Sequence, residues 1–268
     1  MPLGVLPIVL LLGSGTLVGA TLGLIGGGGS ILAVPLLIYL VGVPSIHIAI
    51  GSSAVAVAAN AAWGLASHAR LGTVKWPCAM VFTAAGVAGA FGGAAIGKQL
   101  GGTELLALFG VVMIGIGIYM LIVRPRGDDH DVRLTADSAA RLLPRLLLIG
   151  AGVGLLSGFF GIGGGFLIVP GLVLATGMGL QSAIGTSLFA VTAFGLATAL
   201  SYAVSGLVDW RIALLVIAGG VLGTLLGTRA NVQLAGHKRA LAGIFAGVVI
   251  AVGLYVVVSG ILKLTGAS

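Results

Sequence analysis

Ten hydrophobic runs follow one another along the chain, separated by short polar or glycine-rich breaks. They lie at about 3–25, 31–43, 46–67, 77–98 and 104–123, and again at about 142–160, 166–178, 180–204, 211–232 and 240–262. A helix needs about 20 apolar residues to cross the hydrocarbon core of a bilayer. The runs at 31–43 and 166–178 fall short of that length, and the others are of that order. The pattern therefore predicts an all-α polytopic membrane protein with one short segment in each half.

The two halves also repeat each other in sequence. Residues 19–43 align with 154–178, and residues 45–76 align with 179–210, with Pro44 as a single extra residue. Identical pairs include Gly23/Gly158, Gly26/Gly161, Pro35/Pro170, Gly51/Gly185, Ser53/Ser187, Gly72/Gly206 and Trp76/Trp210. We expect a first transmembrane repeat at 1–123, a charged linker at 124–141 and a second transmembrane repeat at 142–268. Because each repeat has an odd number of segments, the second should be inverted relative to the first, as in many secondary transporters.

The short run of each repeat follows directly on a cluster of glycines and contains a proline, Pro35 or Pro170. Backbone that leaves helical geometry is tolerated at membrane depth only where protein or a water-filled cavity surrounds it. We therefore interpret both runs as short broken or re-entrant helices inside the bundle.

Composition and charge agree with a membrane protein and suggest its orientation. The 268 residues are 59% hydrophobic and only 7% charged, against about 25% charged in soluble domains. The net charge of +7 does not indicate a nucleic-acid partner, because the basic residues lie at segment ends and in the linker. Alternation of the loops puts ten of the 13 Lys and Arg residues on one side of the membrane. Cytoplasmic loops carry such an excess, so the linker should be cytoplasmic and both termini outside.

The glycine clusters are the first candidate binding site. Such runs free the backbone from helical geometry, and a helix that starts just after one directs its free N–H groups and positive dipole end into the gap. Two such helix starts would form a site for an anion. The candidate residues are Gly26, Gly28, Gly29 and Ser30 in the first repeat and Gly161, Gly163, Gly164 and Gly165 in the second. The alternative is a tight helix crossing that binds no ligand.

Two matched hydroxyl pairs are the second candidate. Ser52 and Ser53 correspond to Thr186 and Ser187 in the repeat alignment. These hydroxyls could face the midplane and donate to substrate oxygens, or they could bond backbone carbonyls of their own helix. Asn60 lies two turns further along and has Phe194 as its counterpart. A buried amide in a membrane needs a partner, so Asn60 is either structural or substrate-facing.

Titratable groups are sparse in the predicted spans. All six Asp and Glu residues lie in the linker or at segment ends, whereas cation carriers usually keep a carboxylate within the membrane. This distribution disfavours a cation substrate and favours an anion. His47, His68 and Arg70 lie near the ends of a span and are candidates for coupling or gating. Coupling to protons or to sodium stays open, as does the oligomeric state, and no cofactor or metal site is predicted.

The doubled glycine motif resembles a known family. The pattern Gly23-x-x-Gly-x-Gly-Gly, Pro35, Gly51-Ser-Ser and Trp76, repeated from Gly158 to Trp210, is similar to that of the TauE/SafE permeases. The resemblance covers nearly the whole chain. It implies a carrier in the inner membrane of a bacterium or archaeon that moves sulfite, sulfoacetate or another organosulfonate, or thiosulfate. Export is the commonest activity in that family, although some members take up their substrate. The family's functional regions correspond to Gly26, Gly28, Gly29, Ser53, Gly161, Gly163, Gly164 and Ser187.

Three functions are therefore compatible with the sequence. The first is an anion carrier that works by alternating access, for a sulfur-containing anion or another small organic anion. The second is an intramembrane serine hydrolase in which Ser52 or Ser53 pairs with His47 or His68. It is disfavoured because the second repeat keeps the hydroxyls without a matching histidine, so we expect no enzyme. The third is a membrane assembly subunit that transports nothing.

Overall fold

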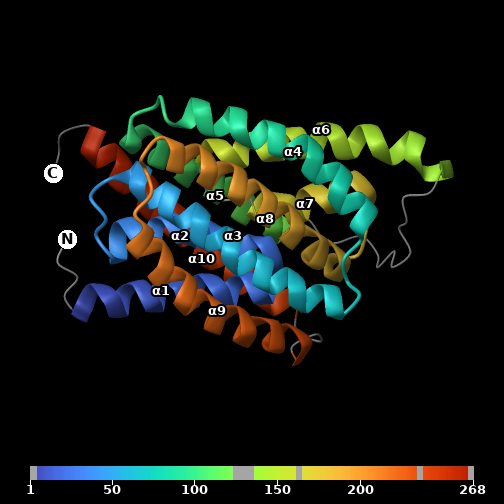
Figure 1. Cartoon of the computed structure of the whole chain (residues 1–268), viewed down its shortest axis with the longest axis horizontal. Coiled ribbons are helices and arrows are strands. Elements are labelled where there is room, and N and C mark those ends of the chain that lie inside the picture. Colours follow the sequence, from blue (N-terminus) through green and yellow to red (C-terminus); the bar gives the residue numbers. More distant parts are fainter. Residues whose placement is uncertain (1–4, 123–135, 161–164, 234–237, 265–268) are drawn as a thin grey trace.

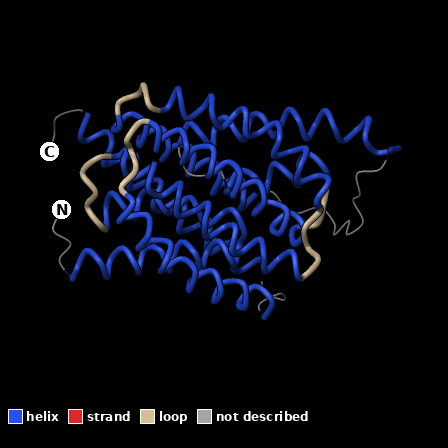
Figure 2. Tube along the Cα trace, viewed as in Figure 1, coloured by secondary structure: helices blue, strands red, loops and turns tan. Residues whose placement is uncertain are grey.

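The computed structural model describes residues 5–122, 136–160, 165–233 and 238–264, and these residues form helices joined by loops, without a strand (Figures 1 and 2). The long helices of the first half are α1 (Val5–Ile25), α3 (Ile46–Arg70), α4 (Trp76–Gly97) and α5 (Gly102–Ile122). Those of the second half are α6 (Ala136–Phe160), α8 (Leu180–Val204), α9 (Trp210–Gln233) and α10 (Lys238–Leu264). The all-α prediction is confirmed for the described chain. Helix α6 begins inside the stretch that the sequence assigned to the linker.

The second segment of each half is short, as predicted. In the first half it is a broken helix made of the 3-10 turn η1 (Gly26–Leu32), α2 (Ala33–Pro35) and the π-helical turn η2 (Leu36–Leu40). In the second half it is α7 (Gly165–Thr176). Seven helices of the described chain are long and apolar enough to cross a membrane, namely α1, α3, α4, α5, α6, α8 and α9. The protein is therefore a multi-pass membrane protein.

Equivalent helices of the two halves pack in equivalent pairs. Helix α1 packs against α9, and α6, its counterpart in the sequence repeat, packs against α4. Helix α3 contacts its counterpart α8, and α5 contacts its counterpart α10. Helices α3 and α8 are the most buried of the candidate spans, so they form the centre of the bundle.

Glycines allow the α1–α9 and α4–α6 pairs to approach closely. A Cβ on Gly19 of α1 would overlap the backbone carbonyl of Gly220 in α9, and a Cβ on Gly154 of α6 would overlap that of Gly86 in α4. On α1 the close contacts recur every four residues, at Gly15, Gly19 and Gly23, which is the small-xxx-small pattern of tightly crossing membrane helices. Packing therefore accounts for this glycine stripe.

The ends of the central helices also match. Gly72 ends α3 and Gly206 ends α8, each with φ of +69°, a left-handed conformation that glycine adopts without steric cost. The chain begins α1 at the same end of the molecule where α10 finishes, whereas α5 finishes and α6 begins at the opposite end (Figure 1).

Candidate functional site

The first glycine cluster lies where α1 gives way to the broken helix. Gly26 has φ of +73°, and a side chain there would meet Ile184 of α8. Gly28 and Gly29 belong to the 3-10 turn η1 and do not form an unwound loop, so this segment differs from the predicted free helix start. Ser30, at the end of the cluster, is completely buried.

The second glycine cluster is only partly within the described chain. Gly161, Gly163 and Gly164 lie outside the described residues, and Gly165 begins α7. The turn η1 and helix α7 are in contact. The short segments of the two repeats therefore meet inside the bundle, as a shared site between them would require.

The hydroxyls of Ser52 and Thr186 each bond to a loop of the other repeat. Ser52 Oγ accepts a hydrogen bond of 2.9 Å from the backbone N–H of Asp209, just before α9. Thr186 Oγ1 accepts one of 3.0 Å from the backbone N–H of Lys75, just before α4. The preceding residues Gly51 and Gly185 leave room for these loops, because side chains there would overlap the Leu207 carbonyl and the Thr73 side chain. The two hydroxyls thus fix the starts of two long helices.

Ser53 and Ser187 bond to their own helices. Ser53 Oγ donates to the carbonyl of Ile50 at 2.9 Å, and Ser187 Oγ donates to that of Ile184 at 2.7 Å. Both pairs lie in the second turn of their helix, and α3 and α8 begin at opposite ends of the molecule (Figure 1). The structure therefore does not bring the two hydroxyl pairs together at one place.

Asn60 lies deep in the centre of the bundle with its amide unsatisfied. Its side chain is completely buried, and neither Nδ2 nor Oδ1 has a hydrogen-bond partner. The amide lies directly against Gly220 of α9, where a Cβ would overlap it. A buried polar group without a partner costs about 1–3 kcal/mol of stability, so its presence needs an explanation.

The three candidates for coupling or gating lie at the two ends of α3. His47, in the first turn, has a buried Nδ1 without a partner, and its ring centroid lies 6.5 Å from that of Tyr202. His68, in the last turn, is buried, and its Nδ1 lies 3.1 Å from Thr73 Oγ1. Arg70 is exposed at the end of the helix. These residues therefore do not form one group.

Lys98 is a residue that the sequence analysis did not select. Its ammonium donates to Ser201 O at 3.2 Å and to the hydroxyls of Ser201 and Ser205, both at 3.0 Å. It also lies 5.8 Å from the centroid of the Tyr202 ring. Lys98 thus ties the end of α4 to the last turn of α8, where a cation also complements the negative end of the helix dipole. Its position as one of few basic residues outside the positive side was the only sequence signal.

The buried polar side chains of the described chain are all uncharged at neutral pH or, for His68, titratable. They are Ser14, Ser30, Ser52, Ser53, Asn60, His68, Thr83, Ser157, Thr186, Ser187, Thr198 and Thr224. Of the carboxylates whose side chains the structure describes, Asp209 caps α9 by accepting from the N–H of Arg211 at 2.9 Å, and Glu104 is exposed in the first turn of α5. Hydroxyl, amide and backbone groups and the His68 imidazole therefore supply the polar chemistry of the described interior.

Comparison with known proteins gives a consistent result. Residues 11–256 match the profile of a family described as sulfite exporter TauE/SafE. A probable membrane transporter protein of Xylella fastidiosa (strain 9a5c) is 48% identical over 253 residues, which cover 93% of this chain and 95% of the relative. The probable membrane transporter protein YunE of Bacillus subtilis (strain 168) is 27% identical and covers 95% of this chain and 99% of its own length. No solved structure gives a significant match.

Proposed function

We propose that this chain, which belongs to the TauE/SafE sulfite exporter family of membrane transporters, is a secondary carrier of a small sulfur-containing anion. The candidates are sulfite, sulfoacetate or another organosulfonate, and thiosulfate, and the proposed direction is export. The family description supports the sulfur chemistry. No carboxylate is buried among the side chains that the structure describes, which supports an anion.

In this proposal the substrate binds between the repeats, at the junction of η1 and α7. The observation that carries it is the contact between these two short segments, each of which begins within or next to a glycine cluster. Backbone N–H groups at the start of a helical segment can bind anions. Gly26, Gly28, Gly29, Ser30 and Gly161, Gly163, Gly164, Gly165 would supply them, with coupling to protons or sodium left to experiment.

We further propose that the repeats are inverted and that they alternate access to the site. The equivalent helix pairs α1–α9 and α6–α4 support this proposal. So does the placement of the start of α1 and the end of α10 opposite the end of α5 and the start of α6 (Figure 1). In this arrangement the linker is cytoplasmic and the termini face outward, across the inner membrane of a bacterium or archaeon. A rocking motion of one repeat against the other would open each side in turn.

Transport is preferred to hydrolysis because of where the serine hydroxyls lie. Ser52 accepts from the backbone of Asp209, Ser53 donates to the carbonyl of Ile50, and the Nδ1 of His68 lies beside Thr73. A nucleophile would instead need a base within hydrogen-bond reach of its hydroxyl. Ser53→Ala separates the two functions, because a nucleophile variant loses all activity whereas a carrier keeps most of its flux.

The test is flux in proteoliposomes with sulfite, sulfoacetate, thiosulfate, sulfate and chloride. We expect saturable and competable flux of one sulfur oxyanion, and a Gly26→Ala variant that inserts normally but loses most of that flux. The reason is that alanine at φ of +73° is strained and meets Ile184. The matched control is Gly13→Ala on α1, where nothing lies within 4 Å of the added Cβ. Wild-type protein that moves none of these anions, or Gly26→Ala with normal flux, would contradict the proposal.

A further inference from the structure

Three helices enclose a seam that contains unsatisfied polar groups. Gly19 of α1, Asn60 of α3 and Gly220 of α9 meet at one level, because a Cβ on Gly220 would overlap the Asn60 amide and one on Gly19 would overlap the Gly220 carbonyl. One turn further on, Gly64 of α3 faces Thr224 of α9, whose Cγ2 would lie 3.3 Å from a Cβ on Gly64. We call this region the α1–α3–α9 seam.

The polar side chains of this seam have no protein partner. Asn60 and Thr224 are both completely buried, and the Asn60 amide atoms and the Thr224 hydroxyl all lack hydrogen-bond partners. They lie one helical turn apart along the seam, about 5.4 Å in axial rise. Buried amide and hydroxyl groups are nearly always satisfied. Thr83, Ser157 and Thr198 also lack partners, but in this seam a whole amide is left open one turn from a hydroxyl, and we explain that combination by a ligand bound in another state.

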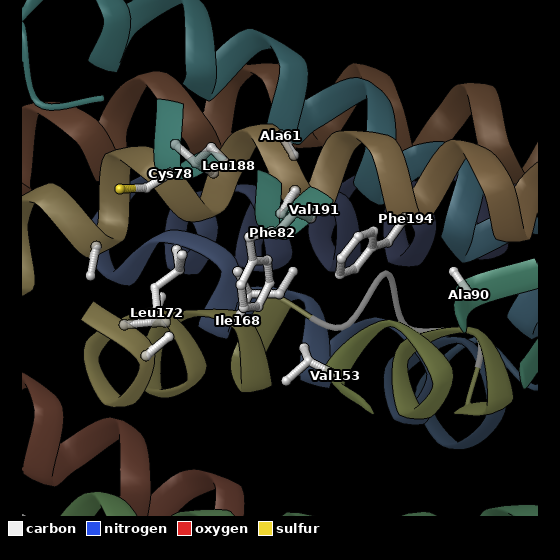
Figure 3. Close-up of a cluster of buried hydrophobic side chains, with 14 of the residues drawn as sticks. Ala61, Cys78, Phe82, Ala90, Val153, Ile168, Leu172, Leu188, Val191 and Phe194 are labelled. Carbon is white, nitrogen blue, oxygen red and sulfur yellow. The ribbon is translucent and has the colours of Figure 1, made fainter. Parts of the chain in front are cut away.

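The equivalent seam of the other half is filled by aromatic rings. It is formed by α6, α8 and α4, and Phe194 occupies the position of Asn60. The Phe194 ring lies against Gly86, the counterpart of Gly220, and stacks on Phe82 with 6.2 Å between the centroids (Figure 3). Ala90 stands where Thr224 stands in the first seam, and it belongs to the same hydrophobic cluster (Figure 3). At the level of Asn60 the pseudo-symmetric partner of the polar seam is therefore apolar, and one turn further on it carries the buried hydroxyl of Thr198, the counterpart of Gly64.

We propose that the α1–α3–α9 seam is the substrate path and that Asn60 and Thr224 bind the oxygens of the transported anion there. This inference rests on the proposed function and makes it more specific. The path is then one-sided, because the α4–α6–α8 seam is closed by the Phe82–Phe194 stack.

The chemistry suits an oxyanion. The Asn60 Nδ2 group offers two N–H donors and the Thr224 hydroxyl offers one more, so together they can replace part of the water around sulfonate or sulfite oxygens without a fixed charge. In the present conformation Asn60 packs on Gly220, and the site is shut. Because α3 belongs to the first repeat and α9 to the second, movement of one repeat relative to the other would open it.

The test compares isosteric variants in the two seams. Asn60→Leu and Thr224→Val remove the proposed donors, and Thr198→Val removes a hydroxyl of α8 that is equally buried and equally without a partner. We expect Thr224→Val to raise KM for the transported anion about tenfold, the effect of one lost hydrogen bond. Asn60→Leu should abolish flux, and Thr198→Val should stay within about twofold of wild type.

Thermal unfolding supplies a readout that a structural role would not produce. If Asn60 is kept for the substrate, leucine removes an unsatisfied amide from the interior, and the midpoint should rise by about 2–4 °C while flux is lost. A structural asparagine would instead lower the midpoint. If Asn60→Leu and Thr224→Val keep the flux and KM of wild type, the seam is not the substrate path, but the proposal that the protein is an anion carrier is unaffected. A wild-type protein silent toward every anion tested would overturn both proposals.

Discussion

At the scale of single residues, glycine decides how closely the helices approach. Gly19 and Gly13 lie on the same helix, yet a Cβ on Gly19 would overlap the Gly220 carbonyl, whereas one on Gly13 would meet nothing within 4 Å. The two positions differ only in what faces them. Composition alone therefore says little about the cost of replacing a glycine in this protein.

This difference predicts the outcome of two alanine substitutions. Gly19→Ala should destabilise the protein by at least about 2 kcal/mol, because the α1 and α9 backbones must separate. Gly13→Ala should be neutral or stabilising by up to about 1 kcal/mol, since alanine is the better helix former. Thermal unfolding of both variants in detergent measures the difference. Equal midpoints would mean that α1 and α9 do not cross at Gly19.

The sequence alone could not separate Gly13 from Gly19. The spacing of glycines along a helix is a local pattern. Which backbone a given glycine faces depends on another helix, which for Gly19 lies about two hundred residues further along the chain. Asn60 posed the same problem. Its isolation in an apolar run was visible, but its contact with Gly220 and its neighbour Thr224 depend on the fold.

At the scale of elements, each repeat holds the start of a helix in the other. The Ser52 hydroxyl accepts a hydrogen bond from the N–H of Asp209, just before α9, and the Thr186 hydroxyl accepts one from the N–H of Lys75, just before α4. The repeat alignment revealed the hydroxyls as a matched pair. It could not reveal their partners, because hydrogen bonds between loops far apart in sequence leave no periodic signal.

These contacts predict a ranking among serine variants. Ser52→Ala should cost about 1–2 kcal/mol of folding free energy, because it leaves the partly buried backbone N–H of Asp209 without an acceptor. Ser53→Ala should cost less than about 0.5 kcal/mol, because the carbonyl of Ile50 that it bonds also accepts a backbone hydrogen bond within the helix. Denaturation midpoints of the two variants, measured side by side, check the order. A larger loss for Ser53→Ala would contradict the assigned contacts.

At the scale of the whole molecule, the long helices run between two ends that carry different loops. The α3–α4 loop lies at the end where α5 finishes, and the α4–α5 loop lies at the opposite end (Figure 1).

The ten segments, their lengths and the two short ones could be predicted because hydrophobicity and length are local properties. The pairing of α1 with α9 could not be predicted, because several other helices of the chain could cover the apolar face of α1 equally well.

The proposed orientation predicts which loops can be labelled from outside. In a Cys78→Ala background, which removes the single buried cysteine, Gln99→Cys in the α4–α5 loop should react with an impermeant thiol reagent on intact cells. Leu71→Cys in the α3–α4 loop and Asp129→Cys in the linker should react only after permeabilisation. Labelling of Leu71→Cys but not of Gln99→Cys on intact cells would reverse the orientation.

The pairing of α1 with α9 also sets the order in which the protein can assemble in the cell. Domains generally form from the N-terminus as the ribosome extends the chain, but here α1 packs on α9, which is made much later. The glycine face of α1 therefore remains in contact with lipid or an insertion factor until α9 has entered the membrane. We expect a chain interrupted before α9 to leave that face uncovered and to be degraded faster than the full chain.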